Sequence, residues 1–561
     1  MYKCPGCGAA LRFDPKSQMM LCDHCRTTLS PRSEELTHLN QSLGQNAVGQ
    51  IPGQDGKIQT IVYTCPNCGG TILSTEETAA TFCSYCGSSV VLEGRLEEQE
   101  APDVIIPFKM DKEDCKASYK RLLNRAVFTP NYMRKDTEID KFRGIYMPYW
   151  IYSFYAQGNT SGSGSTTHRE GNYVVTDHYR VDRYIDSSYD GLHYDAASNF
   201  SDVMSEAIAP FNAVRAEGFA PSYMSGFYAD VSDVDKEVYE GDAGSIALDY
   251  MAGETAGTST HTRCGVSASD VKDSIPLYSG TKRKGYFPVW FLANRIPGKN
   301  MVTYAVMNGE TGKIAADLPV AFWKYILGAL LLAIPIFLLL NLAITVTPTN
   351  ALIATLVISA IMMIVLNVRI NRTYSRQNGI DKGMMNRMSK IPKTPEELAA
   401  ESSLEEEQKK VRQEEKKSRG KGCLMALLWI IGLIAAFILY AAFDEIDSSL
   451  GTLFIVVGVV GAVIIYSIVS AIRESAAKRS GTTAKAPMKK KIVYLIKPIL
   501  GIIVSVLVLI IHPVSDAWYY GAAAFAELMV IWCAFDAVQL HNLGTTRPLP
   551  QFNKRGGVGN A

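Results

Sequence analysis

The chain opens with CPGCGAALRFDPKSQMMLCDHC (residues 4–25), and the same spacing returns in CPNCGGTILSTEETAATFCSYC (residues 65–86). Both stretches follow the pattern C-P-x-C-G-x13-C-x2-C, so every cysteine of the first has a counterpart 61 residues later. The eight ligand-type residues are Cys4, Cys7, Cys22, Cys25, Cys65, Cys68, Cys83 and Cys86. Agreement at four positions without a slip indicates a duplicated unit.

Four thiolates from two Cys-x-x-Cys knuckles suit a soft tetrahedral cation, with each sulfur about 2.3 Å from Zn²⁺. A unit of about 30 residues buries too little apolar surface to fold alone, so metal binding must supply most of its folding free energy. We therefore expect two small β zinc ribbons, at 1–33 and 60–95, joined by a polar linker at 34–59 and holding two structural Zn²⁺ ions. The other four cysteines, at positions 115, 264, 423 and 533, are isolated, which favours metal usage in a reducing compartment over a disulfide framework.

The composition of the second half of the chain is typical of a membrane protein. Six apolar stretches are each close to the roughly 20 residues that a spanning helix requires. They lie at Tyr325–Val346, Ala351–Val368, Cys423–Phe443, Leu450–Ile472, Ile492–Ile511 and Trp518–Leu540. We thus expect an all-α transmembrane region of about six helices, in pairs at 325–368, 423–472 and 492–540.

The loops between these stretches alternate in charge. The connections near 346–350, 443–450 and 512–517 contain no Lys or Arg, whereas the charged loop at 369–422, the basic loop at 473–491 and the tail at 541–561 carry many. The positive-inside rule then predicts a multi-pass protein of the cell membrane with both termini in the cytoplasm. Since Met1-Tyr2-Lys3 leads directly into Cys4, no signal peptide is expected.

Residues 102–320 are predicted to form a cytoplasmic α+β domain. One helix is expected from Asp111 to Phe128, with Asp111 or Asp114 as its cap, and another from Asp233 to Met251. Runs rich in aromatic and β-branched residues predict strands at Gly144–Tyr155, Asn172–Ile185, Tyr286–Ile296 and Asn300–Val306.

Two of these strands share the phrase Y-x-P-x-W, at Tyr146–Trp150 and Tyr286–Trp290. The phrase is short, so a duplicated subdomain and a chance repeat both stay open. Its prolines suggest edge strands or bulges. The stretch Gly158–Ser165 is expected to be a flexible Gly/Ser loop.

No catalytic arrangement is recognisable, and we expect no enzymatic activity. NGETGK at 308–313 has the wrong glycine spacing for a phosphate loop, and Ile314 stands where Ser or Thr would hold magnesium. Asn-Gly between two strand-like runs predicts a hairpin turn instead. The Asp- and His-rich stretch from His168 to Asp195 could hold a further metal, although its alternation favours a solvated strand face.

Three ionisable residues fall in the last two expected spans. Glu527 lies near the middle of the last one, where a carboxylate is costly and indicates a function by default. Pairing inside a helix bundle and lining of a polar pathway are equal alternatives for it. Lys497 and Asp536 lie nearer the cytoplasmic ends, where they can reach the interface, so we expect them to be structural.

The charge of residues 1–100 indicates which class of partner the ribbons bind. Residues 1–100 contain seven basic and eleven acidic side chains, a net charge of −4, and each Zn(Cys)4 centre adds about −2. No Lys or Arg occurs between Thr60 and Glu93. Nucleic-acid binding depends on a basic surface, so a protein is the expected partner.

Several motifs together resemble one known family. They are Cys4-Pro5-Gly6-Cys7-Gly8, Cys65-Pro66-Asn67-Cys68-Gly69, Ile106-Pro107-Phe108-Lys109, Lys141-x-x-Gly144-x-Tyr146-x-Pro148-x-Trp150 and Asn308–Lys313. Over roughly residues 1–345 the chain resembles the bacterial membrane proteins with TFIIB-type zinc ribbons at their N-terminus. Some members are encoded beside PspA-like membrane-stress proteins and SPFH-domain, virion-core-like proteins. The resemblance implies a cytoplasmic zinc-ribbon platform that recruits a partner of that kind to the membrane.

The sequence therefore predicts a membrane-anchored zinc-ribbon adaptor that docks a protein partner at the cytoplasmic face, with a role in the membrane-stress response. Membrane lipids are the other expected partner. Two alternatives of different classes stay open: a membrane-bound nucleic-acid-binding sensor linked to transcription, and a transporter with a regulatory zinc-ribbon domain.

Overall fold

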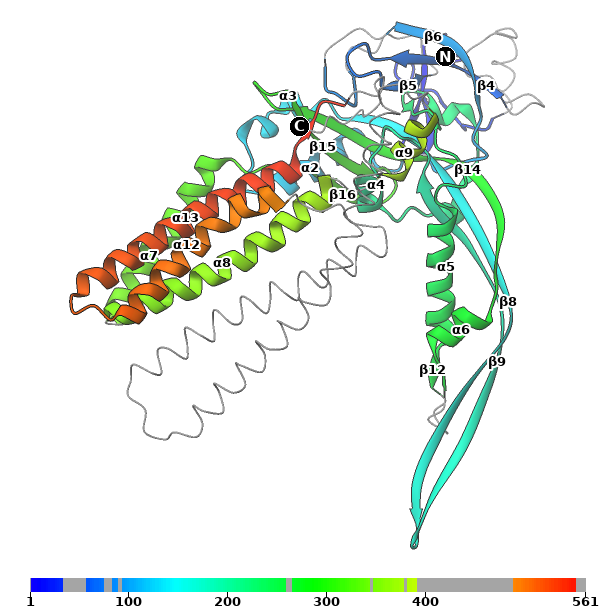
Figure 1. Ribbon diagram of the computed structural model, residues 1–561. Helices are drawn as coiled ribbons and strands as arrows, with labels where there is room; N and C mark the ends of the chain where they lie inside the picture. Colours follow the sequence, from blue (N-terminus) through cyan, green and yellow to red (C-terminus); the bar gives the residue numbers. More distant parts are fainter. Residues whose placement is uncertain are drawn as a thin grey trace, which may run out of the picture.

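An α+β domain lies at one end of a bundle of long apolar helices, and a long β-hairpin projects from the domain (Figure 1). This computed structural model describes residues 2–33, 57–74, 83–88, 93–258, 265–343, 347–377, 381–390 and 488–550. The expected linker falls at 34–56 outside the described residues, as do most of the charged loop, the expected spans at 423–472 and the end of the tail.

The first ribbon is a small antiparallel sheet of three strands, β1 (Leu11–Asp14), β2 (Met19–Cys22) and β3 (Thr28–Leu29), in the order β1-β2-β3. Leu11 and Phe13 alternate inward along β1, as expected of a half-buried strand. They join the core of the α+β domain, where the Phe13 ring meets Tyr223 edge-on at 5.1 Å.

The second ribbon belongs to the large sheet of the domain. Its strands β4 (Lys57–Thr64), β5 (Thr71–Ser74) and β6 (Glu93–Glu100) form one end of a strand order that runs β10-β7-β14-β8-β11-β5-β4-β6. The short members are β7 (Val104–Ile105), β10 (Glu217–Gly218) and β11 (Tyr228–Ala229). The sequence predicted two separate ribbons, but the second one is continuous with the domain through the pairing of β5 with β11.

The two Y-x-P-x-W phrases face each other at the centre of this sheet. They lie on β8 (Arg143–Glu170) and β14 (Leu277–Arg295), which pair antiparallel with Tyr146 opposite Pro288 and Pro148 opposite Tyr286. On its other side, each of the two strands pairs first with a two-residue strand and then with a longer one. For β8 these are β11 and β9 (Tyr173–Asp195), and for β14 they are β7 and β15 (Met301–Asn308). This approximate two-fold relation supports the duplicated subdomain.

The prolines of the phrases lie where these outer neighbours change. The carbonyl groups of Pro148 and Pro288 accept from Ala196 and Gly309, outside the β8–β14 ladder. Because the N and C=O of one strand residue point to the same side, the missing N–H of each proline also points away from that ladder. Proline is therefore tolerated in two central strands.

The Gly/Ser stretch at 158–165 is β-strand, so the predicted flexible loop was wrong. β8 and β9 form a long hairpin in which Gly158 pairs with Ile185 and Ser165 with His178 (Figure 1). Glycine is required where a short hairpin, β12 (Gly257–Thr258) with β13 (Gly265–Val266), crosses β8, since a Cβ on Gly162 would lie 2.1 Å from the carbonyl oxygen of Gly265. Close backbone approach, rather than flexibility, explains glycine there.

The helices of the domain follow the expected positions in part. α2 (Lys112–Arg125) begins at the predicted Asp111, whose side chain accepts from Asp114 N–H in a capping box. α5 (Glu240–Thr255) starts seven residues later than the predicted helix, and α6 (Ala268–Ser274) packs with it against β8 and β9. The shorter helices are η1 (Asn131–Arg134), α3 (Asp136–Ile139), α4 (Asp202–Ile208), η2 (Ala213–Arg215) and η3 (Pro221–Met224).

Three described helices are long and apolar enough to cross a membrane. α8 (Pro348–Gln377), α12 (Met488–Ile511) and α13 (Asp516–Thr545) contain candidate spans of 27, 19 and 30 residues. They confirm the second, fifth and sixth predicted spans as helices of sufficient length. The first corresponds to α7 (Phe322–Ala343), whose apolar part, Phe322–Ile336, is shorter. About six spans are therefore not shown.

The chain after the last long helix returns to the sheet. β17 (Arg547–Pro548) pairs with β15. The side-chain amide of Asn542 accepts from Val320 N–H at 2.7 Å and donates to Val320 O at 2.9 Å. The expected tail thus begins as part of the domain. The Asn308–Lys313 turn joins β15 to β16 (Ile314–Ala316), which pairs antiparallel with β15 before the chain enters α7. That turn is the hairpin that the sequence predicted.

Candidate metal centres

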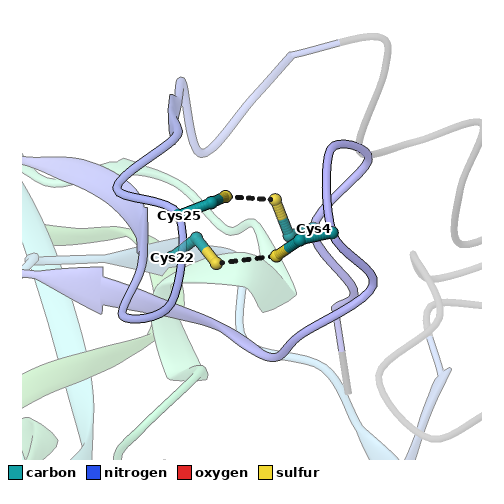
Figure 2. A group of neighbouring side chains, drawn as sticks. Cys4, Cys22 and Cys25 are labelled. Carbon is teal, nitrogen blue, oxygen red and sulfur yellow. Dashed lines mark hydrogen bonds between the residues drawn. The ribbon is translucent and has the colours of Figure 1, made fainter.

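Each set of four cysteines converges on one point, as the sequence predicted. In both sets the four sulfur atoms lie within 4.8 Å of one another, and within the described residues these are the only groups of His, Cys, Asp or Glu with that property. Sulfur separations are 3.4 Å (Cys4–Cys25) and 3.5 Å (Cys7–Cys22) in the first set (Figure 2). In the second they are 3.8 Å (Cys65–Cys86) and 3.7 Å (Cys68–Cys83). Four sulfurs at 2.3 Å from a tetrahedral ion lie about 3.8 Å apart, so both sets could hold a metal ion.

The two centres are built by the same backbone turns. Gly8 N–H donates to Cys4 O, and Gly69 N–H donates to Cys65 O, both at 2.8 Å. Gly8 and Gly69 share a φ of 73°, a left-handed conformation that favours glycine. After the second knuckle the left-handed residues are Arg26 (φ 62°) and Gly87 (φ 67°), again 61 positions apart. The duplication therefore extends to backbone conformation.

The structure adds one residue to each centre that the sequence interpretation missed. The Thr27 hydroxyl lies 3.0 Å from Cys25 Sγ, and the Ser88 hydroxyl lies 2.9 Å from Cys86 Sγ. Hydrogen bonds from Thr27 lower the pKa of the Cys25 thiol to about 6. Both hydroxyl residues stand two positions after the fourth cysteine and obey the 61-residue offset, which is the signal that would have identified them.

The Ser88 hydroxyl should strengthen metal binding at the second centre. A donor to a ligating thiolate stabilises its charge and orientation, and loss of such a contact costs roughly 10–100-fold in metal affinity. We expect Ser88→Ala to lower the zinc affinity of the second centre by about tenfold, measured by competition with a chromophoric chelator. Thr27→Ala is the matched change at the first centre, and unchanged affinity in both variants would contradict this role.

Exposure separates the two centres. Cys7 and Cys25 of the first are exposed, whereas Cys65, Cys68, Cys83 and Cys86 of the second are each 1–2% exposed. Residues of the large sheet cover the second centre. The Tyr85 ring lies 5.8 Å from the Phe291 ring, and the Tyr304 hydroxyl donates to Tyr85 O at 2.9 Å. It therefore forms part of the domain core.

The centres also lie on opposite faces of the sheet. The second packs with Ile145, Met147, Phe287 and Val289, and the first packs with the intervening residues Tyr146, Tyr286 and Trp290. Alternation along β8 and β14 places these two sets on different faces. The first ribbon is held there by hydrogen bonds between Ser225 and the backbone of β1, at 2.6 and 3.1 Å.

Histidine and aspartate between residues 168 and 195 form no further metal centre among the described residues. His168 and Asp177 lie 3.4 Å apart across the exposed β8–β9 hairpin, as expected of a solvated strand face. His193 is a core residue: its Nδ1 lies 2.8 Å from Gly191 O, and its ring packs against Tyr149 and Phe287.

A cluster of buried carboxyl groups lies where α9 (Lys382–Lys390) meets the domain. Asp195 is 2% exposed, and burial together with Asp202 and Asp381 raises the pKa of its carboxyl group well above the usual value. Burial, with Asp202 next, raises the pKa of Asp381 to about 7. Asp381 caps α9 by accepting from Met384 N–H at 3.0 Å, and it accepts from Asp202 N–H at 3.3 Å.

Because of Asp381, we expect the domain to lose stability as the pH rises from about 5.5 to 7. The folded state retains the Asp381 proton up to about pH 7, whereas the unfolded chain releases it near pH 4, so the folded state binds more protons between these values. Asp381→Asn should flatten this decline by on the order of 2 kcal/mol. Thermal unfolding of both proteins across this range measures it. Burial lowers the pKa of His193, which makes stability rise with pH and so opposes the effect of Asp381. The test therefore compares wild type with Asp381→Asn. Stability profiles that stay parallel across the pH range would contradict the assignment to Asp381.

The three ionisable residues within the candidate spans α12 and α13 are arranged differently from one another. Lys497 Nζ lies 2.5 Å from Asp536 Oδ2 and 4.6 Å from the centre of the Trp532 ring, and both side chains of the pair are largely buried. They pair with each other between α12 and α13, both largely buried, rather than reaching an interface separately as expected. Glu527 is exposed on the described surface of α13, so neither alternative for it is decided.

Comparison with known proteins adds one relative. No family model matches the chain, and no solved structure matches it. The chain is similar to the uncharacterized protein YdjG of Bacillus subtilis (strain 168), with 25% identity over 332 residues that cover 58% of this chain and 91% of YdjG. That name states no activity, so function has to be argued from the geometry of the chain itself.

Proposed function

We propose that the protein is a membrane-anchored zinc-ribbon adaptor that docks a protein partner in the cytoplasm through its first ribbon. One observation carries the proposal: the knuckles around Cys7 and Cys25 are exposed, while the equivalent knuckles of the second centre are buried in the sheet. A metal-pinned exposed turn is a rigid recognition surface, since little conformational entropy is lost when it binds. In Figure 1 the N-terminus lies on the side of the domain away from the helices, where a cytoplasmic partner has access.

The metal in both centres is proposed to be zinc. Four cysteines in two Cys-x-x-Cys knuckles with tetrahedral sulfur spacing are the ligand set of a closed structural zinc site, which leaves no coordination position for a substrate. Cys4, Cys7, Cys22 and Cys25 would hold one ion, and Cys65, Cys68, Cys83 and Cys86 the other. The role is therefore structural, and no catalytic residue is assigned.

The membrane anchor is proposed to be the helical region, with the domain and both termini in the cytoplasm. α8, α12 and α13 have the length and composition, and the short connection from α12 to α13 contains no Lys or Arg. The domain, the start of α7 and the end of α13 meet on one side, as this topology requires. Zinc thiolates in a reducing compartment agree with it.

A protein partner fits the first ribbon better than a nucleic acid. Three of its five basic side chains already contact acids of the same chain: Lys16 with Asp111 at 2.6 Å, Arg32 with Glu217 at 3.3 Å, and Arg12 with Asp23 at 3.9 Å. Phosphate binding would need these cations free. The family resemblance points to an SPFH-type or PspA-like partner in a membrane-stress response.

Affinity capture from nanodiscs tests the adaptor role. His24 is an exposed non-ligand residue of the second knuckle, so His24→Glu should leave metal binding intact and reduce partner recovery at least tenfold. Val214→Glu, at another exposed position, on η2, is the control. Identical partner recovery for wild type and His24→Glu would contradict docking through the first ribbon. Salt-dependent binding of DNA or RNA by the full chain would favour the nucleic-acid sensor instead.

A further inference from the structure

The loop Ala126–Pro130, between α2 and η1, lies against the first two turns of α7. Ala321 N–H donates to Phe128 O at 2.7 Å, and Lys324 Nζ donates to Thr129 O at 2.8 Å. The Phe128 ring meets Tyr325 edge-on at 5.9 Å, and a Cβ on Gly328 would lie 2.6 Å from Phe128 Cε1. The loop is therefore fixed at a defined depth along this helix.

That depth corresponds to a membrane boundary. Gly328 is six residues into α7, about 9 Å along the axis at 1.5 Å per residue. The polar headgroup layer on each side of a bilayer is only about 5–8 Å thick. From Tyr325 to Ala343, α7 contains no charged residue, and its large side chains Leu327, Leu330, Leu331, Leu332, Ile334, Leu338 and Leu339 are all more than half exposed. Only an apolar surrounding solvates such a surface.

The loop presents apolar side chains at this level. Val127 is 64% exposed and Phe128 is 40% exposed. Next to them, Phe322 and Trp323 at the start of α7 are also exposed, the latter at 79%. Aromatic residues at the end of an apolar helix are typical of the membrane–water interface.

Basic side chains lie on the elements on either side of the loop. Arg121 and Arg125 share one face of α2, and Lys135 follows η1; all three are exposed, and no ion pair is found for them within the described residues. The nearby Asp136 is neutralised by Lys120 at 2.6 Å. Each basic residue near an anionic membrane surface contributes about 1 kcal/mol to binding.

The loop is also preformed. Arg134 Nη2 donates to the carbonyl groups of Leu123 and Ala126 at 2.5 and 3.2 Å, and the Thr129 hydroxyl donates to Ala126 O at 2.7 Å. These bonds satisfy main-chain groups that water would otherwise have to solvate. A loop whose polar groups are paired internally enters an interface at lower cost.

We propose that Ala126–Pro130 is a membrane-contact element that inserts Val127 and Phe128 at the boundary between headgroups and acyl chains and binds anionic phospholipid headgroups through Arg121, Arg125 and Lys135. It fixes the orientation of the domain on the bilayer. The inference depends on membrane anchorage of the chain and is independent of the adaptor role.

Photo-crosslinking of the full-length protein in nanodiscs tests insertion. A benzophenone amino acid at Val127 should form phospholipid adducts, detected by mass spectrometry, at least tenfold more often than the same group at Leu96. Leu96 is a similarly exposed residue, at 53%, on β6 at the far end of the domain (Figure 1). Equal adduct yields at both positions, or adducts at Val127 only with protein, would overturn the proposal.

The charge requirement is tested with nanodiscs of phosphatidylcholine with and without phosphatidylglycerol. Arg121→Gln/Arg125→Gln/Lys135→Gln should lower the retention of phosphatidylglycerol on the purified protein severalfold in native mass spectrometry, with helix content unchanged. Addition of inorganic phosphate at millimolar concentration should not displace the lipid. Displacement by phosphate, or equal lipid retention by the triple variant, would contradict a headgroup site.

Discussion

Cys83→Ser will unfold the large sheet of the domain, whereas the equivalent change 61 residues earlier, Cys22→Ser, will release only the first ribbon. Cys83 is 2% exposed, and its centre is part of the core formed by β8, β14 and β15. A structural zinc site contributes about 10–16 kcal/mol to folding, which is as large as the whole stability of a typical domain. Loss of one ligand there removes both the metal and the packing that the metal supports.

The first ribbon is attached from outside by β1, Tyr223 and Ser225. Its release should cost the domain roughly 3–6 kcal/mol, at about 1.5–3 kcal/mol for each of the two buried side chains of β1, Leu11 and Phe13. Limited proteolysis of the full-length variants in detergent distinguishes the two cases. The fragment from 93 to 320 should be digested in Cys83→Ser and should survive in Cys22→Ser. Equal resistance of the two variants would contradict the division between the centres.

Lys497→Met should destabilise the helical bundle by about 3–5 kcal/mol, because it leaves the Asp536 carboxylate buried without a partner. Asp536 is 4% exposed, and its only ion pair within the described residues is the one with Lys497. The double variant Lys497→Met/Asp536→Leu removes both charges and should recover most of the loss.

Thermal unfolding of the two single variants and the double variant in detergent completes a double-mutant cycle. A coupling free energy of at least 2 kcal/mol is expected. Additive effects would mean that each charge reaches solvent independently. Lys497→Arg serves as a control, since it retains the charge and the contact with Trp532.

Local features of the sequence predicted much of this fold. The cysteine pattern predicted both metal centres, an aspartate at 111 or 114 predicted the start of α2, and the apolar runs Ala351–Val368, Ile492–Ile511 and Trp518–Leu540 predicted α8, α12 and α13. These signals lie within single segments, where spacing and composition determine structure directly.

Long-range packing could not be predicted in the same way. The strand pairing of Gly158–Ser165 depends on a partner strand and on the approach of Gly265, neither of which leaves a mark on composition. Burial of the second ribbon depends on β5 meeting β11, more than 150 residues later. The Asp381–Asp202 contact likewise joins segments on either side of α8.

Zinc content and zinc release test the central claim most directly. The full-length protein should contain two zinc ions per chain by elemental analysis. A chelator should remove them in two phases of equal amplitude, the fast one absent from Cys22→Ser, since only the first centre is exposed. A single zinc ion per chain, or release of both in one phase, would contradict an exposed centre for docking and a buried centre for folding.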